Sequence, residues 1–259
     1  MTTYAMPARA RKLPTWGYVV IVVVYLAIVQ FGNAIATSGL DWDYGKFRTN
    51  EQVLRALTIP VGASMIFAVI VATVLGWWGP IWKDDRPVQK WVRIVPGLLL
   101  AAIVIGTNYP ELSNRNADFV LLFIVSALMV GFTEELVFRG IGVIAFRANG
   151  FPEARVALWT CLIFGLAHGT NIFVEGPSAI GQVLATAIAG FFFYLVRRST
   201  GYIVFAMALH GLWDFGLFTS NLVKDELYWG AALFILADIV LAILLLVRRH
   251  HIELEGSTY

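Results

Sequence analysis

Two glutamates and an arginine lie close together inside a long apolar run that covers residues 119–146. The centre of this run reads Phe132-Thr133-Glu134-Glu135-Leu136-Val137-Phe138-Arg139. In a membrane-spanning helix each central charge costs about 2.5–3.5 kcal/mol of insertion free energy, so these charges must find partners within the protein. Glu135 and Arg139 are four residues apart and share one helical face, where they can neutralise each other. Glu134 is rotated by about 100° from Glu135, which leaves it as the carboxylate available for chemistry.

The composition is that of a membrane protein rather than of a soluble domain. Of the 259 residues, 59% are hydrophobic and only 14% are charged, whereas about 25% of the residues in a typical soluble domain are charged. The net charge of +2 is small, and no basic patch with interleaved aromatic residues indicates nucleic-acid binding. Cys161 is the single cysteine, so an internal disulfide is excluded, and we interpret its side chain as a small packed hydrophobe.

Eight apolar runs follow one another along the chain, most of them long enough to cross a bilayer. They cover residues 16–35, 54–75, 92–109, 119–146, 156–174, 180–196, 202–218 and 228–247. We therefore expect an all-α, polytopic integral membrane protein of about eight transmembrane helices, with residues 1–259 forming one membrane domain. The first run could also be a cleaved signal peptide, because Ala34-Ile35-Ala36 resembles a cleavage site. Its length and the seven further runs favour a retained span.

The distribution of lysine and arginine predicts the orientation. With the N-terminus in the cytoplasm, thirteen of these residues fall on the cytoplasmic side, namely Arg9, Arg11, Lys12, Lys83, Arg86, Lys90, Arg93, Arg147, Arg155, Arg197, Arg198, Arg248 and Arg249. Five fall outside, namely Lys46, Arg48, Arg55, Arg115 and Lys224. We therefore expect both termini in the cytoplasm and the protein in the plasma membrane of a prokaryote.

Polar side chains occur at one common depth in three of the runs. They are Glu134, Glu135 and Arg139 in the fourth run, Phe164-x-x-x-His168 in the fifth, and His210-x-x-x-Asp214 in the seventh. Glu134 is 13 residues from Arg147, His168 is 13 from Arg155, and His210 is 12 from Arg198, which corresponds to roughly 18–20 Å from the basic residues. Any one of these side chains, taken alone, could equally have a structural role and form an interhelical hydrogen bond, worth about 0.6 kcal/mol. Because they share a depth, we infer that the three helices converge on one cavity inside the bundle.

The ordered motifs Glu-Glu-x-x-x-Arg, Phe-x-x-x-His and His-x-x-x-Asp resemble those of the CPBP family of intramembrane proteases. This family includes CAAX-processing endopeptidases and bacteriocin-immunity proteins. The resemblance covers residues 119–218, the expected catalytic core, and takes in Gln182 and Gly190 of the sixth run. It implies an intramembrane endopeptidase that hydrolyses a peptide bond of a membrane-associated or lipid-modified peptide or protein. It also implies a polar entrance on the cytoplasmic side.

The resemblance implies a role for each motif. Glu134 and His168 would activate a water for attack on a peptide carbonyl. His210 and the residue at position 214 would hold the oxyanion of the tetrahedral intermediate. Glu135 and Arg139 would form a supporting ion pair.

Two further residues of the motifs need separate interpretation. Phe164 lies one turn before His168 and is expected to pack against the imidazole. The family more commonly has Asn where this chain has Asp214, and an ionised Asp cannot donate a hydrogen bond to an oxyanion. Asp214 could be kept protonated by burial, could orient His210, or could help to bind a cation; we favour the orienting role.

Metal dependence is a separate question. His168, His210 and Glu134 form a two-histidine, one-carboxylate set that could hold a divalent metal such as zinc. The sequence lacks the His-Glu-x-x-His pattern typical of zinc proteases, so a glutamate-type protease without a metal is an equal alternative.

Other classes of function remain as alternatives. Asp238 lies near the centre of the eighth run and is interpreted as a packing residue, but with Glu134 and the two histidines it would also suit a proton-coupled transporter. The absence of repeated halves in the sequence disfavours transport. A non-catalytic immunity or scaffold protein would keep the same fold. The sequence specifies no oligomeric state, and its only predicted partners are the bilayer and the peptide substrate.

Overall fold

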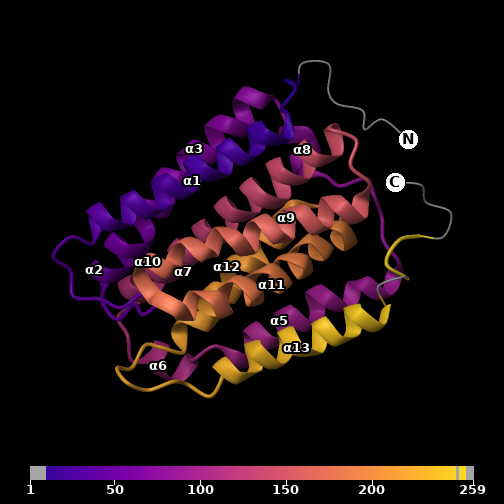
Figure 1. Ribbon diagram of the computed structural model, residues 1–259. Helices are drawn as coiled ribbons and strands as arrows, with labels where there is room; N and C mark the ends of the chain where they lie inside the picture. The colour runs from indigo at the N-terminus through magenta and orange to yellow at the C-terminus, as the bar shows by residue number, and fades with distance from the viewer. Residues whose placement is uncertain (1–9, 249–250, 255–259) are drawn as a thin grey trace.

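The computed structural model describes residues 10–248 and 251–254, which form a bundle of helices without a β-strand (Figure 1). Arg9 and Arg249, which the charge count includes, lie outside the described residues. All eight predicted runs are helical, and the expected all-helical architecture is confirmed.

The long helices follow the apolar runs closely. They are α1 (Thr15–Ala36), α3 (Ile59–Leu75), α5 (Ile94–Gly106), α7 (Ala117–Glu134), α9 (Glu153–His168), α11 (Ala179–Thr200), α12 (Ile203–Thr219) and α13 (Ala231–Arg248). Shorter helices are α2 (Asn50–Val53), α4 (Trp78–Trp82), α6 (Tyr109–Ser113), α8 (Val143–Ala148) and α10 (Ile172–Glu175). Two π-helical segments, η1 (Leu54–Thr58) and η3 (Glu135–Gly142), join α2 to α3 and α7 to α8.

Six helices of the described residues are long and apolar enough to cross a membrane. They are Thr15–Ala36, Asn50–Leu75, Ala117–Ala148, Glu153–Glu175, Ala179–Thr200 and Ala231–Arg248. Two of the eight predicted runs form shorter helices: α12 has 17 residues and α5 has 13. The protein is therefore a multi-pass membrane protein, with six helices rather than eight of full spanning length.

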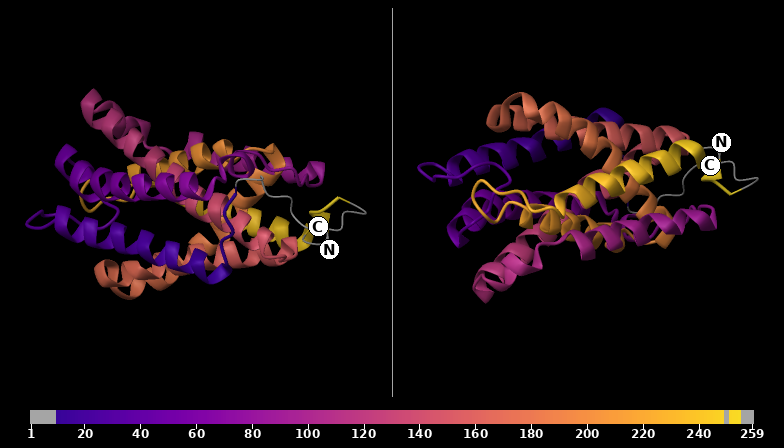
Figure 2. Two further views of the ribbon diagram at one scale, coloured as in Figure 1. Left: turned by 90° about the horizontal axis from the view of Figure 1, so that it is seen from above. Right: turned by 90° about the horizontal axis from the view of Figure 1, so that it is seen from below.

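The helices form three groups, which Figures 1 and 2 show from different sides. Helix α1 packs along α3 on one side, and α5 packs along α13 on the other. Between these pairs lie α7 with η3 and α8, and then α9, α11 and α12, with the closest associations between α7 and α12 and between α9 and α11. The central group carries all the residues of the three motifs.

One end of the bundle gathers the described terminal segments and a cluster of buried charges. The cluster consists of Asp84, Arg86, Arg147, Glu153, Arg197 and Arg198. Arg147 Nη1 lies 3.0 Å from Asp84 Oδ2, and Arg198 Nη1 lies 3.1 Å from Glu153 Oε1. Burial alone would raise the pKa of the Asp84 carboxyl, but the surrounding guanidinium groups, led by that of Arg197, hold the pKa below its ordinary value. We call this end the basic end.

Candidate active site

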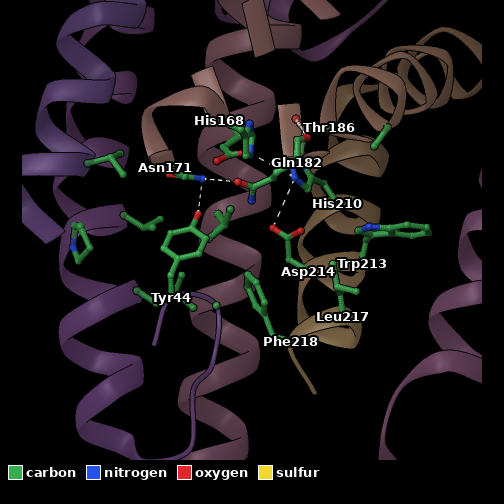
Figure 3. A pocket seen from close by; sticks show the side chains of 18 of the residues that line it. Tyr44, His168, Asn171, Gln182, Thr186, His210, Trp213, Asp214, Leu217 and Phe218 are labelled. Atoms are coloured by element: carbon green, nitrogen blue, oxygen red, sulfur yellow. Dashed lines mark hydrogen bonds and ion pairs between the residues drawn. The ribbon is translucent and has the colours of Figure 1, made fainter. Parts of the chain in front are cut away.

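The four predicted catalytic side chains line one cavity of about 260 Å³, shown in Figure 3. They are Glu134 at the end of α7, His168 at the end of α9, and His210 and Asp214 on α12. The convergence that the common depth predicts is therefore present in the structure.

A close crossing of α7 and α12 brings the first and third motifs together. Gly131 of α7 faces Gly211 of α12, and a Cβ atom on Gly211 would lie only 2.6 Å from the Cα atom of Leu128. A Cβ atom on Gly131 would lie even closer to the backbone of Gly211. Two helices can approach this closely only where both lack side chains. The crossing places His210, which precedes Gly211, beside the acidic pair.

The buried ion pair sits in the π-helical segment that follows Glu134. Arg139 Nη1 donates to Glu135 Oε1 at 2.9 Å, and both side chains are fully buried. The guanidinium of Arg139 also lies over the Phe164 ring, 4.0 Å from its centroid. Gly190 of α11 leaves room for this side chain, because a Cβ atom there would lie 2.5 Å from Arg139 Nη2. The predicted pair is present, and π-helical turns occur frequently at functional sites.

His210 is held by the second glutamate rather than by Asp214. Its Nδ1 donates to Glu135 Oε1 at 2.8 Å, and its ring stacks on Phe193 with 4.4 Å between centroids. Nε2 faces the cavity, 3.6 Å from Glu134 Oε2 and 3.7 Å from Asp214 Oδ2. Glu135 thus makes the short contact that fixes the imidazole, a role that sequence reasoning gave to Asp214.

His168 is fixed by its own helix. Its Nδ1 lies 3.0 Å from the carbonyl oxygen of Phe164, and a carbonyl oxygen can only accept, so Nδ1 carries the proton. The other ring nitrogen, Nε2, is then left as an acceptor. The Phe164 ring packs edge-on against His168 and His210, with centroids 4.8 Å and 5.8 Å apart. Phe164 therefore packs against imidazole as expected, and against both histidines.

A second, smaller cavity of about 60 Å³ touches both Glu134 and His168. Its other walls include Tyr25 of α1, whose hydroxyl interacts with the Glu134 carboxylate. A water molecule needs a cavity of at least about 10–15 Å³ and two to four polar partners. The space beside Glu134 and His168 therefore suits a bound water.

A network of amides and a tyrosine forms a polar wall of the larger cavity (Figure 3). Asn171 Nδ2 donates to Tyr44 Oη at 2.7 Å and to Gln182 Oε1 at 2.8 Å, and Gln30 Nε2 donates to Asn171 Oδ1 at 3.1 Å. Burial raises the pKa of the Tyr44 phenol well above its ordinary value, although its interaction with Gln182 opposes this effect. Sequence reasoning missed Tyr44 and Asn171. The sequence offered a signal for Asn171, because it is a polar residue only three positions after His168. It offered none for Tyr44, because this residue lies in a loop far from the three motifs.

Residues 116–216 match the family model described as type II CAAX prenyl endopeptidase Rce1-like. This segment is similar to the Rce1-like family. The Rce1-like segment contains all three motifs, so the predicted resemblance to CAAX proteases is confirmed. It runs from the residue before α7 to within α12, and leaves out α1, α13 and the loop that carries Tyr44. No curated protein matches the chain.

The cavity extends away from the basic end. Most of its walls beyond the Rce1-like segment come from the second half of α1, the start of α3 and the loop between them, at the end opposite the described terminal segments; the end of α12 and Asp238 of α13 complete them. An entrance on the cytoplasmic side, beside the termini, stays a prediction, and the direction of the cavity favours the opposite side. The spacing between a motif residue and a basic residue gives the depth of the motif along its helix. It does not give the direction in which the cavity between the helices widens.

The predicted metal ligands do not form a preformed metal site. Within residues 10–248 and 251–254, no group of three His, Cys, Asp or Glu side chains is placed to hold a metal ion. Nδ1 of His168 is engaged by Phe164 and Nδ1 of His210 by Glu135, which leaves Nε2 of each ring as the nitrogen that could bind a metal. Binding of zinc by Glu134, His168 and His210 stays a prediction.

Proposed function

We propose that this protein is an intramembrane endopeptidase that hydrolyses a peptide bond of a membrane-associated or lipid-modified peptide or protein. The observation that carries the proposal is the arrangement of three side chains around one space. Glu134 and His168 border a water-sized cavity, and His210 faces Glu134 from the adjoining helix. Similarity of the Rce1-like segment to a protease family supports the same reaction class.

In this mechanism Glu134 acts as the general base. Its carboxylate takes a proton from the water that it shares with His168, and the resulting hydroxide attacks the carbonyl carbon of the scissile bond. Nε2 of His168 accepts a hydrogen bond from the same water and orients it. Glu134 then returns the proton to the leaving amine, because the reaction consumes one water and leaves the enzyme unchanged.

His210 is assigned to the oxyanion. The Glu135 carboxylate holds Nδ1–H, so a protonated ring directs Nε2–H into the cavity, where negative charge develops on the substrate oxygen. Asp214 lies beside Nε2 and can contribute to the oxyanion site only in its protonated form, in which it donates a hydrogen bond. Its ionised form would instead stabilise the imidazolium.

The proposal includes a topology. The basic end holds most of the described lysines and arginines, so both termini are assigned to the cytoplasm. The cavity then lies in the half of the bilayer away from the cytoplasm, and a substrate reaches it from that half. In this proposal the protein resides in a cell membrane, with its catalytic cavity in the outward-facing half of the bilayer.

The proposed function is tested by comparing protein termini in cells that express wild type or Glu134→Ala. We expect a small set of membrane-protein termini present only with wild type, because the variant lacks the base that activates water. Asp118→Asn is a matched control, since it removes an exposed acid at the start of the same helix, outside the cavity. Identical termini in all three strains, with the protein expressed at equal levels, would instead favour a non-catalytic immunity or scaffold role.

Chelation is expected to leave the hydrolysis rate of the purified protein within about twofold of its untreated value. The reason is that, among the residues that the structure describes, no group of three His, Cys, Asp or Glu side chains is placed to hold a metal ion. Metal content, measured by mass spectrometry, should be well below one ion per chain. A rate that falls on chelation and returns with added zinc would restore the metalloprotease alternative.

A further inference from the structure

The first helix borders the space in which the proposed mechanism places the attacking water. Tyr25, Val29 and Gln30 of α1 line both the larger cavity and the small one beside Glu134 and His168. Of the three, Tyr25 is the only one that is almost fully buried, with 4% of its surface exposed. A side chain from outside the Rce1-like segment is therefore present at the reacting groups.

The ring of Tyr25 is fixed against the π-helical segment that follows Glu134. It packs edge-on against Phe138, with 6.0 Å between centroids and 87° between the ring planes. Phe138 is four residues after Glu134 and packs in turn edge-on against Phe164, at 5.0 Å. Because the Tyr25 ring is enclosed and held by this contact, the part that remains free to turn is the hydroxyl hydrogen. The oxygen therefore has a fixed place beside Glu134.

The hydroxyl of Tyr25 and the carboxylate of Glu134 interact as hydrogen-bond partners. An ionised carboxylate can only accept, so Tyr25 is the donor. A hydrogen bond from a hydroxyl to a carboxylate is charge-assisted and about twice as strong as one between neutral groups. His210 Nε2 lies 3.6 Å from Glu134 Oε2, which is too far for a hydrogen bond. The contact with Tyr25 is therefore the one suited to orient Glu134.

Glu134 needs such a contact because the protein holds it less firmly than its neighbour. Glu135 is fully buried and accepts from Arg139 and His210. The Glu134 side chain is 17% exposed and, within the described residues, forms no ion pair with a lysine or an arginine. A general base has to lie about 2.6–3.2 Å from the atom whose proton it takes. A donor fixed on a neighbouring helix meets this requirement.

We infer that Tyr25 is a positioning residue, whose hydroxyl holds the Glu134 carboxylate in the orientation that takes a proton from the water shared with His168. This inference rests on the proposed endopeptidase function. Tyr25 lies on α1, outside residues 116–216, so the three motifs do not specify it. Helix α1 then contributes to the rate of hydrolysis as well as to the packing of the bundle.

The test compares wild type with Tyr25→Phe, each as full-length protein in lipid nanodiscs. The substrate is an internally quenched, acyl-anchored peptide whose sequence spans a terminus that cells produce only with wild type. Phenylalanine keeps the ring that packs against Phe138 and removes only the hydroxyl. We expect kcat to fall about 10- to 10²-fold, as a displacement of up to about 1 Å can cause. KM should stay within about twofold, because the hydroxyl acts in the transition state and not in binding.

Tyr18→Phe is the matched control on the same helix. Tyr18 lies seven residues before Tyr25, on the same face of α1, and its fully buried ring packs edge-on against Phe146 at 5.6 Å. Its hydroxyl is enclosed without a hydrogen-bond partner among the residues that the structure describes, and it borders neither cavity. This variant should keep the wild-type kcat and KM. Its melting temperature should be unchanged or higher, because a buried hydroxyl without a partner is unfavourable.

A double substitution shows whether Tyr25 acts through Glu134. In the Glu134→Gln background the carboxylate that the hydroxyl positions is absent. Adding Tyr25→Phe should therefore lower the residual kcat by less than about twofold, whereas independent effects would multiply. Long incubations measure the residual rates, and melting temperatures show that each variant is folded.

Several results reject the inference and keep the endopeptidase function. They are a wild-type kcat in Tyr25→Phe, an equal fall in Tyr18→Phe, and a full further fall when Tyr25→Phe is added to Glu134→Gln. A loss of rate that only matches a loss of folded Tyr25→Phe protein also rejects it, since the hydroxyl would then serve stability. Absence of any cleavage that Glu134→Gln removes rejects the proposed function and the inference together.

Discussion

Glu134→Gln is expected to lower kcat for peptide hydrolysis by about 10²- to 10⁴-fold, the range typical of a lost general base. An amide of the same shape cannot take a proton from water, so the attacking hydroxide no longer forms. The substitution should leave the fold intact, because the Glu134 side chain is 17% exposed and its nearest charged neighbour, His210, is 3.6 Å away. Initial rates on a cleavable peptide, with melting temperatures as the control for folding, measure both effects.

Substitution of the neighbouring acid, Glu135, is expected to affect stability, in contrast to substitution of Glu134. Glu135 is fully buried and accepts from both Arg139 and His210. Glu135→Gln removes the charge that compensates a buried guanidinium, and breaking such a pair costs about 3–5 kcal/mol. We therefore expect a clearly lower melting temperature for Glu135→Gln and an almost unchanged one for Glu134→Gln. Wild-type turnover in Glu134→Gln, or equal melting temperatures of the two variants, would contradict the assignment of roles.

The convergence of the motifs could be predicted because helices convert sequence distance into depth. Glu134, His168 and His210 lie at similar distances along their helices from basic residues, and those residues lie at one end of the bundle. The extents of the helices were also predictable from the apolar runs. The number of full-length spans was not, because α5 has only 13 residues and ends earlier than its run suggests, and α12 covers its run but has only 17 residues.

The contact between Glu135 and His210 could not be predicted from spacing. The two residues are 75 positions apart, and which face of α12 meets which face of α7 depends on the crossing at Gly131 and Gly211. The π-helical turn at Glu135 also changes the rotation between successive side chains, so a regular helical wheel misplaces them. Sequence reasoning therefore paired Glu135 with Arg139 correctly. It assigned the orientation of His210 to Asp214, whereas Glu135 makes the short contact with the imidazole.

The basic end illustrates a further limit. Arg147, Arg197 and Arg198 were used as markers of the membrane surface, yet all three are buried in the structure. Their partners include Asp84, which lies in the connection between α4 and α5. Charge patterning locates the end of a bundle, but it does not reveal that the charges at this end pair with one another inside the protein.

Gly131→Ala is expected to destabilise the protein by about 1–3 kcal/mol, as overpacking does, and to lower kcat/KM by about 10²-fold, as a displacement of about 1 Å can. The added methyl group would meet the backbone of Gly211, which cannot rotate away as a side chain can. Helices α7 and α12 must therefore separate. Melting temperatures and kcat/KM of the purified variant measure the two effects.

Gly97→Ala is the matched control for this prediction. Gly97 lies on an exposed face of α5, where a Cβ atom would meet nothing within 4 Å. Alanine in a helix is more favourable than glycine by about 1 kcal/mol, so this variant should be as stable as wild type or slightly more stable. Its kcat/KM should stay at the wild-type value.

The loss of activity in Gly131→Ala should exceed any loss of folded protein, because the crossing sets the distance between the groups that react. Gly131 is three residues before Glu134, and Gly211 directly follows His210. Separation of the helices therefore moves the base away from the oxyanion donor even in molecules that remain folded. A variant that is folded and fully active would show that α7 and α12 need not be in contact at this point. The close crossing would then serve packing alone.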